Sequence, residues 1–287
     1  NMWIIYSKII MEQSERVKWE EDGEVEWGFD ERNERLIIKG KEPLKDTGEV
    51  KTYKMKDYSY VGDTPWVQKY GNQIQSVVVC YGVSSIGDRT FANCPSLKFV
   101  LIPDGVSSIG NYAFHNCKGL KEIHFPGSVR SIGYNPFVGC EQLSSIEIAK
   151  ENQHFKIVDG VVFDKEMTLL ISYGSCSKSE YEVPDTVTSI GTSAFYECNA
   201  LTSIMIPDSV TFICDYAFYH CDGLRSIIVP NSVRMIGTSA FENCFNLNSV
   251  TIKGDLDAIG ERVFYNCTNL TTFKLNKVVK TGKDVFT

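Results

Sequence analysis

Residues 106–126 read VSSIGNYAFHNCKGLKEIHFP, and the same pattern returns along most of the chain. Its cysteine recurs every 23 residues on either side of one interruption, with an isoleucine eight residues and a phenylalanine three residues before it. The seven phenylalanine–cysteine pairs are Phe91/Cys94, Phe114/Cys117, Phe137/Cys140, Phe195/Cys198, Phe218/Cys221, Phe241/Cys244 and Phe264/Cys267. Seven copies in phase at three positions indicate an array of stacked repeats.

The second half of each copy follows the leucine-rich-repeat pattern L-x-x-L-x-L, as in Leu97, Val100 and Ile102. Alternating apolar residues predict a short strand with one buried face. One such strand cannot bury that face alone, so neighbouring copies must stack into one core. We therefore predict a repeat solenoid, mostly β with short helical turns, in the form of a right-handed leucine-rich-repeat arc with an N-terminal β-hairpin cap.

The stretch Gly-x-x-Ala-Phe-x-x-Cys predicts a short turn between strands. Residues such as Asp88 and Asn111 follow the glycine, and we expect them to satisfy free N–H groups at the start of such a turn. The cysteine column lies in register with the phenylalanines, which favours small buried thiols over metal ligands or disulfides. Cys80, Cys176 and Cys214 fall outside this column, and their state is left open.

Two segments depart from the 23-residue period. Residues 1–73 are predicted to be a β-rich cap, with a hairpin around 25–38 and Trp66 plugging the open end, whereas 74–287 form the solenoid. One repeat, at about 149–183, is 35 residues long. Its apolar runs, 161–163 and 169–171, flank a polar turn and predict a second hairpin.

Composition excludes several classes of function. With 29 Lys and Arg against 36 Asp and Glu, the net charge of −7 is opposite to that of a nucleic-acid binder. No apolar run reaches the ~18 residues of a membrane helix. The apolar stretch from Met2 to Met11 is too short for a span and has no clear cleavage site, so we expect an extra edge strand or a tail, with a signal-peptide remnant as the alternative.

No motif predicts catalysis, a cofactor or a metal site. C-x-x-C zinc pairs are missing from the sequence, as are phosphate loops and nucleophile elbows. His220 adjoins Cys221, but that cysteine belongs to the core column. Glu122 and Glu147 could approach one another across strands, although most such pairs are solvated surface. We therefore expect a non-enzymatic protein.

The outward side of the L-x-x-L-x-L strands, usually the concave face of a leucine-rich repeat, is the candidate binding surface. Most of its positions carry small hydroxyl or charged residues, but two apolar clusters interrupt them, and exposed apolar surface often marks an interaction site. The alternative is strand propensity on a solvated sheet. The predicted partner-binding residues are Val78, Phe99, Leu101, His124, Glu147, Met205 and Ile228.

The full pattern, with Ile109-Gly110, Ala113-Phe114, Cys117 and Leu120 as its clearest copy, resembles the BspA-like leucine-rich repeats over about residues 74–275. Trp27, the stretch 36–40 and Pro65-Trp66 are similar to that family's leader. The resemblance implies an extracellular or cell-surface adhesion module that binds host matrix or microbial surface proteins. A glycan-binding surface protein and an intracellular interaction scaffold are the alternatives. Neither the particular partner nor the oligomeric state follows from the sequence.

Overall fold

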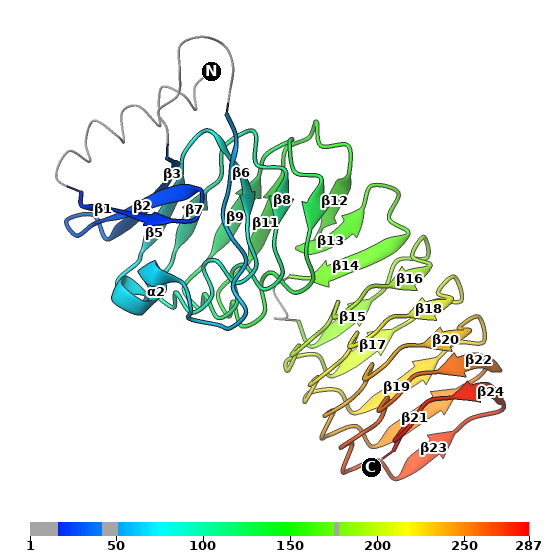
Figure 1. Ribbon diagram of the computed structural model, residues 1–287. Coiled ribbons are helices and arrows are strands. Elements are labelled where there is room, and N and C mark those ends of the chain that lie inside the picture. Colours follow the sequence, from blue (N-terminus) through cyan, green and yellow to red (C-terminus); the bar gives the residue numbers. More distant parts are fainter. Residues whose placement is uncertain (1–16, 42–50, 175–177, 287) are drawn as a thin grey trace. The chain divides into compact units, whose positions relative to one another are not determined.

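The computed structural model describes residues 17–41, 51–174 and 178–286, and Figure 1 shows them as successive turns of short strands. The chain divides into two compact units, residues 1–155 and 156–287, hereafter the N-terminal and C-terminal units. Each is a β-solenoid, which confirms the predicted fold class.

In the N-terminal unit, a hairpin extends the sheet formed by the first repeats. Strands β2 and β3 pair antiparallel along their whole length, which confirms the predicted hairpin, and β3 continues in parallel to β5. Val25, Trp27 and Phe29 of β2 and Leu36 and Ile38 of β3 are buried, as the alternation predicts. Ile37 is buried as well, because it lies in a separate cluster on the other side of the sheet. The sheet runs in the order β1 (Trp19–Asp22), β2 (Val25–Asp30), β3 (Arg35–Gly40), β5 (Ser76–Val79) and β7 (Phe99–Leu101).

A short helix, α2 (Pro65–Tyr70), closes this end of the core. Trp66 is fully buried against Trp27, Tyr58 and Phe91, and its indole N–H donates to the carbonyl of Thr90 at 2.9 Å. The prediction that Trp66 closes the open end of the core is therefore confirmed. The remaining strands of this unit are β4 (Tyr53–Lys54), β6 (Val83–Ile86), β8 (Ser108–Ile109) and β10 (Ser131–Ile132) in one sheet, and β9 (Glu122–Phe125) with β11 (Ser145–Ile148) in another.

The C-terminal unit starts within the long repeat. Strands β13 and β14 form the predicted antiparallel hairpin, and the carboxylate of Asp164 closes its turn by accepting from the N–H groups of Thr168 and Leu169. One sheet follows the order β12 (Phe155–Val158), β13 (Val161–Asp164), β14 (Leu169–Tyr173), β16 (Ser189–Ile190), β18 (Phe212–Ile213), β20 (Met235–Ile236), β22 (Leu256–Ile259) and β24 (Val278–Thr281). The opposite side of this unit has two smaller sheets. One contains β15 (Glu180–Glu182) and β17 (Ser203–Met205), and the other contains β19 (Ser226–Val229), β21 (Ser249–Ile252) and β23 (Thr272–Lys274).

Stacked phenylalanines run through the core of each unit. In the C-terminal unit the ring of Phe218 lies 4.9 Å from that of Phe195 and 5.0 Å from that of Phe241, nearly parallel to both. Beside this stack, the thiol of Cys244 donates to the carbonyl of Phe218 at 3.0 Å, and four other column cysteines make the same bond to the preceding repeat. A cysteine suits this position because it is small and apolar yet satisfies a buried carbonyl.

Side-chain hydrogen bonds connect the turns of neighbouring repeats. Asp88 makes a contact of the expected kind, but with the turn of the next repeat: its carboxylate accepts from the backbone and side-chain N–H groups of Asn111. Asp215 makes the same backbone contact with Thr238. The contact crosses repeats because the N–H that follows the glycine of the next repeat lies within hydrogen-bond distance of the carboxylate.

Replacing Asp88 with alanine removes both contacts to Asn111. We expect this substitution to lower the free energy of unfolding by about 1 kcal/mol, the typical cost of a lost cap. Urea denaturation followed by circular dichroism measures the change. Asp104→Ala is the matched control because Asp104 is exposed; an equal effect of the two substitutions would contradict the inter-repeat cap.

The cysteine column is buried, as predicted, but it is not uniform. Cys94, Cys117, Cys140, Cys221, Cys244 and Cys267 are free and buried, whereas Cys198 is disulfide-bonded, which corrects the expectation of a thiol there. Of the cysteines outside the column, Cys80 is buried, Cys214 is half-buried, and Cys176 lies outside the described residues. Burial raises the pKa of Cys80 and of Cys94 to about 12.

These environments predict the order in which the described thiols react. Burial raises the pKa of four column thiols, those of Cys94, Cys117, Cys221 and Cys244. A thiol with a raised pKa stays protonated and unreactive at pH 8, so these four should not react with iodoacetamide until the protein unfolds. Cys214 should be labelled first because it is the most exposed of them. Peptide mass spectrometry after timed labelling checks this order, and early labelling of Cys94 or Cys244 would contradict it.

Candidate functional site

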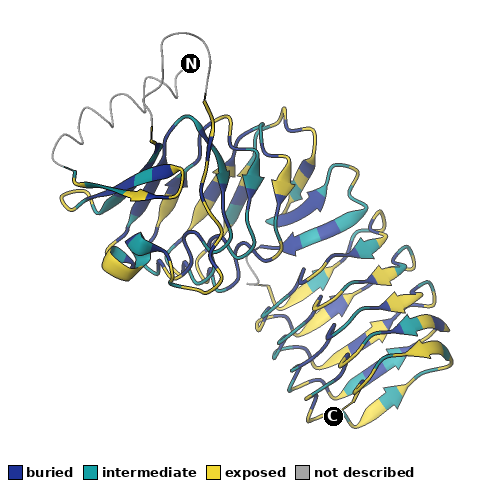
Figure 2. Cartoon of the chain, in the orientation of Figure 1, coloured by how far each residue is buried: buried dark blue, intermediate teal, exposed yellow. Residues whose placement is uncertain are grey.

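One outward-facing row of side chains on the C-terminal unit combines an apolar centre with charged ends. Glu182, Met205, Ile228, Thr251 and Lys274 follow one another at the same position of β15, β17, β19, β21 and β23. We call this row the strand-face column. Along these strands exposed and buried residues alternate (Figure 2), because the inward neighbours Ile204 and Ile227 belong to the core.

Met205 and Ile228 are far more exposed than apolar side chains of their size normally are in a folded protein. Met205 is 62% exposed and Ile228 54% exposed, and they lie one repeat apart on neighbouring strands. The small residues Ser203 and Ser226 stand beside them, so nothing in the described part of the chain covers either side chain. The structure thus places these two predicted residues next to each other on the surface.

In the N-terminal unit the corresponding face is more polar. His124 and Glu147 are direct neighbours on β9 and β11, with 3.6 Å between the imidazole Nδ1 and the carboxylate, and both side chains are exposed. Phe99 is 47% exposed, whereas Leu101 is half-buried. This face therefore offers one exposed aromatic ring and one histidine–glutamate pair.

The prediction that Val78 is exposed on this face is wrong. Val78 is only 3% exposed and forms a small cluster with Ile37 and Cys80. Val17 and Trp19 pack over that cluster because β1 adds to the hairpin and brings Trp19 to the outward side of the sheet. The cap thus covers the first repeats, a contact that repeat spacing cannot predict.

Two exposed apolar residues on the opposite sheet of the C-terminal unit were not predicted from the sequence. Phe212 and Met235 are partners in register on β18 and β20, and each is 44% exposed. Most other repeats carry serine at this position, as at Ser108, Ser131 and Ser189, so the change of residue type was the available signal. Tyr196 and Tyr219 stack on each other with ring centres 4.9 Å apart.

The repeat pattern matches a protein-family model, the BspA type leucine rich repeat region, in six copies over residues 70–167 and 171–287. The chain belongs to the BspA-type leucine-rich-repeat family. Repeats of this family are generally non-catalytic, and they are associated with interaction and adhesion modules and with surface proteins.

Solved structures show the same fold as this BspA-type chain. A leucine-rich repeat protein from Eubacterium ventriosum is 23% identical, with a TM-score of 0.58 over 88% of this chain and 83% of its own. The pneumococcal vaccine antigen PcpA is 16% identical, with a TM-score of 0.59 over 93% of this chain and 85% of its own. No curated protein matches the chain. Among the described residues, none of the helices has the length and apolar character needed to cross a membrane.

Proposed function

We propose that this chain is a non-catalytic adhesion module that binds a host or microbial surface protein through the strand face of its repeats. The observation that carries the proposal is the strand-face column, where Met205 and Ile228 are more than half exposed side by side. Contiguous exposed apolar surface with a polar surround is the usual anatomy of a protein-binding patch.

The charges around this patch favour a protein partner over an apolar one. Glu182 and Lys274 stand at opposite ends of the column, so the surface presents a negative end, an apolar centre and a positive end. Such an arrangement fixes the orientation of a partner with complementary charges. The N-terminal unit carries its own candidate surface, formed by Phe99, Leu101, His124 and Glu147.

Two further observations support a location outside the cell. Disulfides persist in oxidising compartments, and Cys198 is disulfide-bonded. A similar fold occurs in a pneumococcal vaccine antigen. We therefore infer a surface or secreted protein.

The proposal is tested by a solid-phase screen of the purified chain against matrix proteins, serum proteins and bacterial surface extracts. We expect saturable binding to at least one protein, with no turnover of it. Binding confined to protein-free glycans, or turnover of the bound protein, would contradict an adhesion module of this kind.

A further inference from the structure

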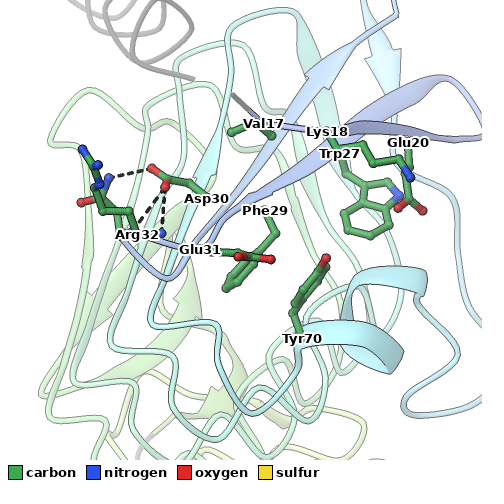
Figure 3. A pocket seen from close by; sticks show the side chains of 10 residues that line it. Val17, Lys18, Glu20, Trp27, Phe29, Asp30, Glu31, Arg32 and Tyr70 are labelled. Carbon is green, nitrogen blue, oxygen red and sulfur yellow. Dashed lines mark hydrogen bonds between the residues drawn. The ribbon is translucent and has the colours of Figure 1, made fainter. Parts of the chain in front are cut away.

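A pocket of 790 Å³ lies within the N-terminal unit, between the hairpin and the end of α2. Its wall contains three aromatic side chains, Trp27 and Phe29 from β2 and Tyr70 from α2. The rings of Phe29 and Tyr70 stack at 4.3 Å, and the Tyr70 hydroxyl points toward the space between Phe29 and Trp27 (Figure 3). The volume falls within the range of about 300–1,000 Å³ that is usual for small-molecule sites.

Trp27 contributes an unsatisfied hydrogen-bond donor to this wall. The residue is 1% exposed, and its indole N–H finds no acceptor among the described residues. The neighbouring Trp66, whose ring lies 5.9 Å away, donates its own N–H to Thr90. Buried donors in folded proteins are normally satisfied, and the described residues leave this one without an acceptor.

The charges of the lining are nearly balanced. Glu20 is neutralised by Lys69, whose Nζ lies 2.6 Å and 2.7 Å from its two oxygens, and Asp30 is occupied by the amide of Asn33 at 2.6 Å. Arg32 is turned away from Phe29 and Tyr70 (Figure 3). Within the described chain, this leaves Lys18 and Glu31 as one cation and one anion without an ion-pair partner.

A neutral polyhydroxyl ligand fits this lining better than an ionic or a purely apolar one. Hydroxyl groups both donate and accept, so one ligand type can accept from the Lys18 ammonium and the Tyr70 hydroxyl and donate to the Glu31 carboxylate. The C–H face of a pyranose ring packs on the exposed part of Tyr70. We propose that this pocket is a binding site for a neutral saccharide, independent of the protein-binding face.

The test is binding of the full chain to an array of neutral and acidic glycans, followed by calorimetric titration with the strongest neutral hit. Three variants remove single polar groups and keep the packing: Lys18→Gln, Glu31→Gln and Tyr70→Phe. Lys18 and Glu31 are exposed, and the phenylalanine ring preserves the stack on Phe29. Glu166→Gln and Tyr216→Phe are matched controls because both residues lie in the C-terminal unit.

We expect the neutral saccharide to bind the wild-type chain and to bind Lys18→Gln, Glu31→Gln and Tyr70→Phe each about tenfold more weakly, since the first two replace a charge-assisted hydrogen bond by a neutral one and the third loses its hydrogen bond. The two controls and a Met205→Glu variant should bind as the wild type does, which separates this site from the strand face. Three results would overturn the proposal: no glycan bound at millimolar concentration, only acidic glycans bound, or equal affinity in the pocket variants.

Discussion

Replacing Met205 and Ile228 together with glutamate should weaken binding of the protein partner at least about a hundredfold, because each residue at the centre of such a patch typically contributes 2 kcal/mol or more. Both side chains are more than half exposed, so the free energy of unfolding should change by less than about 1 kcal/mol. The glutamates place two charges where the partner must desolvate the surface. Biolayer interferometry with the partner found in the screen measures the loss.

The matched control is a Phe212→Glu, Met235→Glu variant. These residues are also apolar, exposed and one repeat apart, but they lie on the opposite sheet of the same unit. The control should therefore bind as the wild type does. If both double variants lost binding equally, the effect would be one of net charge rather than of the strand face.

Replacing Phe218 with alanine should lower the free energy of unfolding by about 3–5 kcal/mol, the usual cost of removing a buried phenylalanine. Phe218 has no exposed surface and stacks on Phe195 and Phe241, so its loss opens a cavity that neither neighbouring repeat can fill. The urea unfolding midpoint, measured by circular dichroism, reports the change.

Phe212→Ala is the control for this substitution. Phe212 is 44% exposed, and its removal should cost less than about 1 kcal/mol. A midpoint for Phe218→Ala no lower than that of Phe212→Ala would show that the phenylalanine stack does not hold the repeats together.

The parts of the fold that depend on local periodicity could be predicted from the sequence. Strand positions, the hairpin at 25–38 and the burial of Phe114 or Phe218 follow from spacing alone, because each repeat presents the same residues to the same neighbours. The turns could be predicted only in part. Asn93 and Asn243 stand at positions with φ of 62° and 61°, where asparagine is favoured, yet Glu197 and His220 adopt the same conformation without that signal.

The candidate sites show where periodicity stops being informative. Met205 and Ile228 could be identified because the repeat fixes which side chains face outward. Val78 occupies the same position but is covered by Trp19, which is more than fifty residues away in the chain and lies outside the repeats. The pocket at Trp27 and Tyr70 likewise combines two segments that share no periodicity.

The most direct test of the central claim is photo-crosslinking from the strand face to the bound partner. A benzophenone amino acid replaces Ser226, which is exposed on β19 two residues before Ile228, and in a second protein it replaces Thr211 beside the opposite sheet. Binding through the strand face predicts a covalent adduct with the partner from position 226 and none from position 211. An adduct from position 211 alone would contradict the account.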